Sequence, residues 1–167
     1  MFRYIILALI FITKSIFNAG YSEANSYVYK VESHLSTSIN SIFVPKHMDY
    51  TTYKLNGSWT DNYGNFGLIK CTGETRILVT KEVNIFGICE ITDEDKNRKW
   101  WSLKRQKSEL DLGVGKSKQL TGERIWSILN DMECNYAIKH AEGFSYMKTS
   151  CNINERQHKK LQANKTK

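Results

Sequence analysis

The sequence predicts an all-β fold, an antiparallel up-and-down β-barrel of about seven or eight short strands. Apolar and polar residues alternate with period two over much of the chain from residue 48 onward. Turn-forming residues separate these runs at intervals of roughly 8 to 12 residues. No long amphipathic helical pattern is evident. We favour a closed barrel because closure removes the exposed edges that an open sheet must protect.

The first 24 residues have the features of a secretory signal peptide. Arg3 precedes an apolar run from Tyr4 to Thr13, which is too short for a comfortable membrane span. Ser22 and Ala24 fit the small-x-small rule for cleavage after Ala24. A buried N-terminal helix and an uncleaved anchor are the alternatives. We therefore expect a secreted or periplasmic protein without a transmembrane span after cleavage, divided into a signal peptide (1–24), a β-barrel domain (25–153) and a basic disordered tail (154–167).

The positive charge lies mostly in that tail. The chain has a formal net charge of +7, and the last stretch, NERQHKKLQANKTK, sets five basic residues against Glu155. So polar a stretch cannot bury enough apolar surface to order itself, and we expect disorder. The tail suits an anionic surface as partner, or it is simply a solvated end. We expect no specific nucleic-acid partner.

Four cysteines lie after the signal peptide, and their even number in an exported chain predicts two disulfides. Three connectivities are possible. We favour the near-neighbour solution, in which Cys71 pairs with Cys89 and Cys134 with Cys151. No CxxC pair exists and the four histidines are scattered, so we expect no zinc or other metal.

The strands can be placed in order along the first half of the chain. SYVYKVES (26–33) is compatible with a strand, and the serine-rich LSTSINS (35–41) is interpreted as a loop. Tyr53, Leu55, Gly57 and Trp59 share one parity before a turn at DNYGN (61–65). FGLIKCT (66–72) forms another short run.

The clearest alternation is ILVTKEVNIFGICEITD (77–93), where odd positions are mostly apolar and even positions mostly polar, as in a half-buried strand or hairpin. DEDKN (93–97) closes this run as a turn. RKWWSLKR (98–105) is the next strand, and Trp100 and Trp101 must lie on its opposite faces.

The stretch LDLGVGKSKQL (110–120) resembles the end of a phosphate-binding P-loop, but it lacks the glycine that the motif requires at Leu110. A polar segment precedes it, and Gly122 interrupts any helix after Ser117. We therefore expect no nucleotide binding, and we interpret the glycines as bends in a strand.

The C-terminal half of the domain ends in a hairpin. ERIWSILND (123–131) can hold two helical turns or a strand. ECNYAIKH (133–140) and FSYMKTSC (144–151) flank a turn at Glu142-Gly143. With that turn, Cys134 and Cys151 lie directly opposite on one face, where their β-carbons come close enough for a disulfide.

Asp93, Asp95 and Asn97 match the first three ligand positions of a calcium loop. Arg98 and Lys104 occupy the positions of the required glycine and glutamate, so we favour a polar turn.

Two further patterns carry little chemistry. Asn56 and Asn164 begin glycosylation sequons, and Glu109 and Asp111 form a carboxylate pair that we interpret as solvated. No catalytic residue and no cofactor are predicted.

LNGSWTDNYGN (55–65) resembles the opening strand and turn of avidin-type and lipocalin-type barrels, which carry Gly-x-Trp there. GVGKSKQLTG (113–122) resembles a glycine-spaced strand and turn in small secreted barrels related to allene oxide cyclase. The resemblance implies a calycin-like barrel in which Trp59 closes one end. It also implies that Asp61 and Asn62 stand near the position of ligand-contacting polar groups in avidins. The later tryptophan-rich strands of avidins have no counterpart here.

These observations favour a non-enzymatic protein that binds a small apolar or amphipathic ligand in the barrel mouth. An envelope or extracellular interaction module, such as an inhibitor or accessory factor using a surface patch or the basic tail, is the alternative. A cyclase-like or isomerase-like enzyme is the third hypothesis. The candidate ligand-binding residues are Tyr53, Trp59, Asp61, Asn62, Trp101 and Tyr136.

Overall fold

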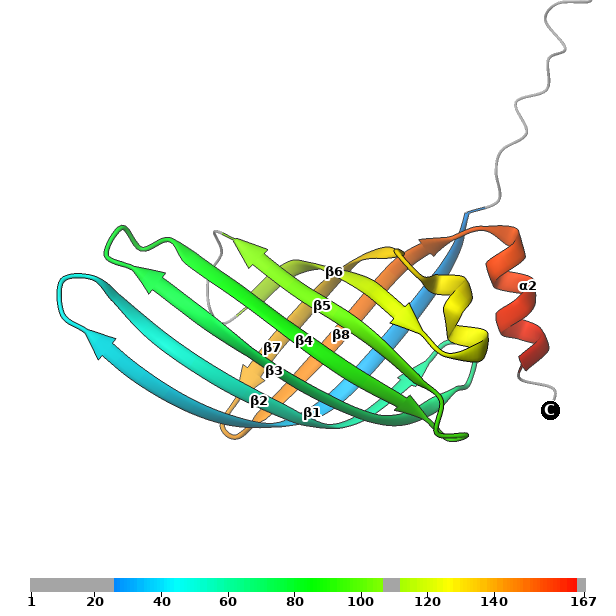
Figure 1. Ribbon diagram of the computed structural model, residues 1–167, viewed down its shortest axis with the longest axis horizontal. Coiled ribbons are helices and arrows are strands. Elements are labelled where there is room, and N and C mark those ends of the chain that lie inside the picture. Colours follow the sequence, from blue (N-terminus) through cyan, green and yellow to red (C-terminus); the bar gives the residue numbers. More distant parts are fainter. Residues whose placement is uncertain (1–25, 107–111, 165–167) are drawn as a thin grey trace, which may run out of the picture.

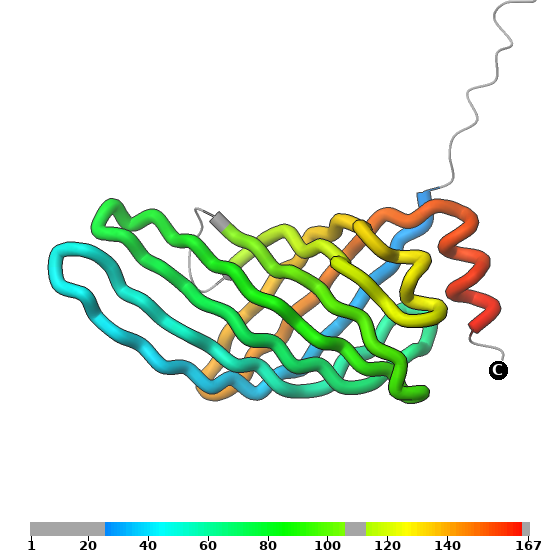
Figure 2. The backbone as a smooth tube through the Cα atoms, viewed as in Figure 1, coloured from blue at the N-terminus to red at the C-terminus, as the bar shows by residue number. Residues whose placement is uncertain are grey.

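The sheet closes on itself, each strand lying beside the next around the wall of a barrel (Figures 1 and 2). Along most of the strands, buried side chains alternate with exposed ones. The computed structural model describes residues 26–106 and 112–164. Within these ranges each strand pairs antiparallel with the next, and the last pairs with the first. The predicted all-β barrel is therefore confirmed. The strands are β1 (Tyr27–Val44), β2 (Met48–Asp61), β3 (Phe66–Leu78), β4 (Val83–Asp93), β5 (Arg98–Gln106), β6 (Leu112–Gly122), β7 (Glu133–Ala141) and β8 (Phe144–Ile153).

The predicted signal peptide, the Glu109–Asp111 pair and the last three residues of the chain lie outside the described residues.

The prediction of a loop at 35–41 is wrong, because β1 continues through this segment. Leu35 pairs with Gly57 and Ser41 pairs with Thr51 across the β1–β2 hairpin. Main-chain hydrogen bonds to β2 therefore order a stretch whose composition alone does not indicate a strand. The alternation was hard to recognise because, after the buried Leu35, every side chain from Ser36 to Ser41 is polar or exposed.

The predicted hairpins and strand faces are otherwise confirmed. The run 77–93 divides at a turn between β3 and β4. On β5, Trp101 is 1% exposed inside the barrel, whereas Trp100 lies on the outer face beneath the Arg98 guanidinium. In the last hairpin Cys134 pairs with Cys151, as the Glu142-Gly143 turn predicted.

Both predicted disulfides are present and both lie inside the barrel. Cys71–Cys89 joins β3 to β4, and Cys134–Cys151 joins β7 to β8. All four cysteines are buried. The bridges therefore tie together two hairpins that face the same core, and their presence suggests an oxidising compartment.

We expect the double replacement Cys134→Ala/Cys151→Ala to lower the free energy of unfolding by about 2–4 kcal/mol, because the unfolded chain loses a loop constraint. Urea denaturation measures this, with Ser150→Ala on the outer face of β8 as the control. Non-reducing peptide mapping should recover Cys71 with Cys89. A peptide that joins Cys71 to Cys134 would contradict the register.

Two helical segments cover one end of the barrel (Figure 1). The 3₁₀ helix η1 (Arg124–Leu129) lies within the segment for which helical turns were one of two interpretations. The helix α2 (Glu155–Asn164) corrects the prediction of a disordered tail. Leu161 of α2 is fully buried, and His158 stacks on Tyr27 with ring centroids 3.9 Å apart.

A capping box explains where α2 begins. The Asn154 side chain accepts a hydrogen bond from the Gln157 N–H at 2.9 Å, and the Gln157 side chain accepts one from the Asn154 N–H at 2.9 Å. This reciprocal pattern satisfies two N–H groups at the start of a helix. The sequence therefore contained a signal for the helix, which its polar composition obscured.

Candidate functional site

The open end of the barrel contains a cavity of about 350 Å³. This volume falls within the range of small-molecule sites. The cavity lies opposite η1 and α2, where the β1–β2 and β3–β4 hairpins extend beyond the other strands (Figure 1). Its aliphatic lining residues are Ile39, Leu55, Ile77, Ile85, Leu103 and Ile138.

The polar groups in this wall come from five strands. They include the side chains of Tyr53, Arg105, Tyr136 and His140. Among the described lining residues there is no Asp or Glu. The cavity therefore combines an apolar wall with hydrogen-bond donors and one permanent positive charge.

Two neighbouring glycines make room for Tyr53. Gly73 and Gly87 are cross-strand partners on β3 and β4. A β-carbon at Gly73 would lie 2.4 Å from the Tyr53 hydroxyl oxygen, and one at Gly87 would lie 2.5 Å from it. The Tyr53 hydroxyl donates a hydrogen bond to the Phe86 carbonyl oxygen at 3.2 Å. The ring can therefore lie against the wall instead of filling the cavity.

Gly113 and Gly115 likewise make room for two other side chains, those of Arg105 and Tyr136. A β-carbon at Gly113 would lie 1.1 Å from Arg105 Nη1, and one at Gly115 would lie 2.4 Å from Cζ of Tyr136. Both glycines face inward on β6, which continues as a strand through Ser117. Their spacing in the sequence indicated bends in a strand, and the structure shows that their missing side chains leave space for Arg105 and Tyr136.

Arg105 is 3% exposed, and its positive charge lies close enough to both tyrosines to act on their pKa values. Burial raises the pKa of Tyr53 and the pKa of Tyr136, and the Arg105 charge opposes this shift only in part. Both phenols therefore remain protonated at neutral pH.

A short hydrogen-bonded chain lies at the cavity mouth. His140 Nδ1 is 2.7 Å from Ser145 Oγ, which is 2.6 Å from Thr37 Oγ1. Thr37 and His140 line the cavity, whereas Ser145 is fully buried behind them. These hydrogen bonds orient His140. The Ser145 hydroxyl is too deeply buried to act as a nucleophile on a molecule in the cavity.

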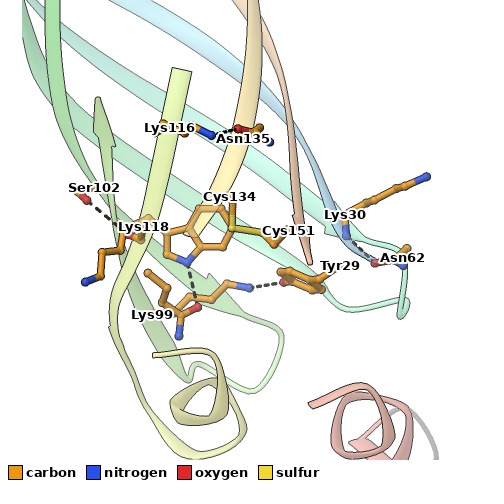
Figure 3. The surroundings of a disulfide bond; sticks show 12 residues. Tyr29, Lys30, Asn62, Lys99, Ser102, Lys116, Lys118, Cys134, Asn135 and Cys151 are labelled. Carbon is orange, nitrogen blue, oxygen red and sulfur yellow. Dashed lines mark hydrogen bonds between the residues drawn. A yellow bond between two sulfur atoms is a disulfide. The ribbon is translucent and has the colours of Figure 1, made fainter. Parts of the chain in front are cut away.

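The closed end is built around a buried lysine side chain. Lys99 is fully buried, and its Nζ lies 3.5 Å from the ring centroid of Trp126 and 3.9 Å from that of Trp59. The Lys99 amino group donates a hydrogen bond to the Tyr29 hydroxyl at 2.8 Å, near the Cys134–Cys151 disulfide (Figure 3). Burial lowers the pKa of Lys99 to about 7, and nearby carboxylates, Asp61 first, oppose the shift.

Hydrogen bonds fix the aromatic rings around Lys99. Trp126 Nε1 donates to Asp93 at 2.7 Å, and Trp101 Nε1 donates to Gln119 at 3.0 Å. Asp93 also accepts from the Asn97 N–H at 2.7 Å, so the DEDKN segment is a polar turn. This end is a packed plug, and the cavity lies at the other end.

The structure separates the six candidate ligand-binding residues. Tyr53 and Tyr136 line the cavity. Trp59 and Trp101 are buried in the plug. Asp61 ends β2 and Asn62 begins the turn to β3, and Asp61 accepts hydrogen bonds from the N–H groups of Tyr63 and Asn65. Asn62 there accepts from Lys30 and donates to Val28.

Arg105 is a cavity-lining residue that was not among the six candidates predicted from the sequence. It has the same parity on β5 as Lys99, Trp101 and Leu103, which all point inward. Because Trp101 was expected to be buried, the alternation along the strand also indicated that Arg105 points inward. A charged residue is normally assigned to the surface, which obscured this indication.

Within residues 26–106 and 112–164, no helix combines the length and apolar composition needed to cross a membrane. The same residues contain no group of three or more His, Cys, Asp or Glu that could hold a metal ion.

No family model matches the chain, and no curated protein matches it in sequence. Two solved structures share the fold. A conserved protein of unknown function from Rhodopseudomonas palustris has a TM-score of 0.60 at 7% identity, covering 76% of this chain and 95% of its own. A protein of unknown function from Clostridium acetobutylicum has a TM-score of 0.63 at 8% identity, covering 80% and 100%. At such identities the likeness shows the fold alone.

Proposed function

We propose that this barrel is an exported, non-enzymatic protein that binds a small apolar or amphipathic molecule in its open-end cavity. The proposal is supported chiefly by the glycines around the cavity. The inward-facing glycines leave room for Tyr53, Arg105 and Tyr136 beside the wall, and a cavity of about 350 Å³ with aliphatic and polar lining residues remains. The two disulfides support export because such bonds persist in oxidising compartments.

An enzyme is less well supported. The described cavity lining offers no carboxylate as an acid or base, and Ser145 is fully buried beside His140. The interaction-module alternative has one favourable observation. Phe43 and Val79, which are 72% and 65% exposed, lie on the two hairpins joined by the Val79 N–H to His47 carbonyl bond. A substitution that fills the cavity should leave binding of a partner at Phe43 and Val79 unchanged. Such a variant therefore distinguishes partner binding from small-molecule binding.

Native mass spectrometry of the full-length protein, expressed with its signal peptide and purified from an exporting host, tests the proposal. We expect a retained small molecule that is released on denaturation. Ile85→Trp, which fills the cavity from its wall, should abolish retention. Phe86→Trp places the same ring on the outer face of β4 and should retain the molecule. The absence of any retained molecule, together with no binding of alkyl probes, would overturn the proposal.

A further inference from the structure

The second half of β1 has one edge that no described strand covers. The first half pairs with β8, and the Thr37 N–H makes the last main-chain hydrogen bond to that side, to the Gly143 carbonyl oxygen at 3.1 Å. From there β1 continues to Val44 beside β2 alone, past the β7–β8 hairpin (Figure 1). Within residues 26–106 and 112–164, no strand pairs with the other edge of residues 38–44.

This edge presents main-chain groups without the usual protection. Residues of an antiparallel strand direct their N–H and C=O groups to its two edges in alternation. Since the Thr37 N–H points toward the β8 side, those of Ile39, Ser41 and Phe43 also point to the open edge. Proteins usually protect such an edge with charged side chains, because it is a template for another strand. The segment SHLSTSINSIFVP (33–45) contains no Lys, Arg, Asp or Glu.

The side chains along the open edge are complementary to a second copy of the same strand. Ile39, Ile42 and Phe43 are 62%, 57% and 72% exposed. Ile39 and Phe43 share the inner face of the strand, with Ser41 between them. An antiparallel copy centred on Ser41 would place Ile39 opposite the partner's Phe43, and Phe43 opposite the partner's Ile39. Cross-strand pairs of an aromatic and a β-branched residue stabilise a sheet.

We propose that β1 pairs with β1 of a second copy of this chain across a two-fold axis at Ser41, which forms a symmetric dimer. Three hydrogen-bonded residue pairs across the axis supply about six main-chain hydrogen bonds. The same register brings the partner's Lys46, in its β1–β2 turn, toward Glu142 in the β7–β8 turn. Both residues are exposed, and their opposite charges favour this arrangement. The axis repeats this contact, so each dimer contains it twice.

The second copy also extends the wall of the cavity. Ile39 lines the cavity and is nevertheless largely exposed, so the wall is open beside β1. In the dimer the partner's Phe43 lies next to Ile39 and covers this opening. The dimer does not depend on the ligand proposed above, because the open edge and its apolar side chains belong to the protein alone.

Sedimentation velocity of the protein, expressed with its signal peptide and purified from an exporting host, tests this inference. We expect a dimer whose fraction increases with protein concentration. Phe43→Lys should raise the dissociation constant by at least about 30-fold, because it places two charges in each dimer interface. The matched control is Phe66→Lys. Phe66 is 55% exposed at the start of β3, by the plug, and its replacement should leave the dimer unchanged.

Substitutions at Ser41 test the main-chain pairing and its register. Ser41→Pro removes an N–H group from the open edge and leaves the hydrogen bonds to β2, so it should yield a monomer, whereas Ser41→Ala should remain dimeric. Ser41→Cys should form a disulfide between two copies on mild oxidation, and Ser58→Cys, on the outer face of β2, should not.

Circular dichroism checks that each variant is folded, and if Ser41→Pro is not, Phe43→Lys and the disulfide decide. A monomer at every concentration would overturn the proposal. A dimer that Phe43→Lys leaves intact, or that Ser41→Cys does not cross-link, would overturn it as well. Neither result would affect retention of a small molecule, which native mass spectrometry measures separately.

Discussion

Replacing Trp101 by alanine is expected to lower the free energy of unfolding by about 3–5 kcal/mol, whereas Trp100→Ala should cost less than about 1 kcal/mol. The two residues are adjacent on β5 but point to opposite faces of the sheet. Trp101 is 1% exposed, and its indole N–H donates to the buried Gln119 side chain. Its removal leaves a cavity in the plug and an unpaired amide oxygen.

Urea denaturation followed by circular dichroism measures both variants under the same conditions. The pair is well matched because the side chain removed is identical and the sequence position differs by one. Similar losses of stability for the two variants would contradict the assignment of the faces. The Gln119 side-chain amide donates a hydrogen bond to the Trp126 carbonyl oxygen at 2.6 Å. Trp101→Ala should weaken this bond as well, which adds to the loss of stability.

Inward-facing side chains fill one end of the barrel and leave a cavity at the other. On β5, Lys99 and Trp101 belong to the plug, whereas Arg105 lines the cavity. On the strands around the cavity, inward glycines replace bulky residues, as Gly73 and Gly113 do. A period-two pattern therefore predicts which side chains point inward, but it does not predict whether the interior is filled or hollow.

This distinction explains which parts of the structure could be predicted. Strand faces, turns and the Cys134–Cys151 pairing follow from local alternation and from counting residues around a turn. The position of Arg105 against Gly113 depends on the register between β5 and β6, which shifts between Trp100 and Trp101 and does not follow from local alternation. The Gly-x-Trp resemblance placed Trp59 at a barrel end, and the structure places it in the plug.

Composition was misleading at the C-terminus for a different reason. The segment after residue 154 is mostly polar and basic, which predicts disorder when the segment is considered alone. In the folded protein, Leu161 is buried, and the His158 ring nitrogen Nδ1 is 2.6 Å from the Tyr63 hydroxyl oxygen. Leu161 and the His158 ring are enough to hold the helix in place, because the end of the barrel supplies the rest of the packing surface.

The stability of the protein is expected to increase with pH between about pH 7 and pH 9.5 because of Lys99. Burial lowers the pKa of Lys99 from 10.5 to about 7 in the folded protein. The unfolded chain keeps this lysine protonated throughout the interval, so the unfolded state binds more protons than the folded state. The free energy of unfolding therefore rises with pH, and the unfavourable contribution of the buried amine is largest below pH 7.

Lys99→Met removes this titration while retaining an unbranched side chain between Trp59 and Trp126. Relative to this variant, wild-type protein should gain about 2–3 kcal/mol between pH 7 and pH 9.5. The neighbouring Tyr29 hydroxyl does not titrate in this interval, because burial raises the pKa of Tyr29 well above 10.0. The exposed Lys104→Met variant should follow the wild-type pH profile.

Urea denaturation of the three proteins at half-unit pH intervals provides the measurement. A constant difference between wild-type protein and Lys99→Met would show that Lys99 keeps its proton. In that event the two indole faces, within 3.9 Å of Nζ, stabilise the ammonium enough to offset its desolvation. A difference that grows with pH instead means that the plug contains a neutral amine above pH 7, held by its hydrogen bond with Tyr29.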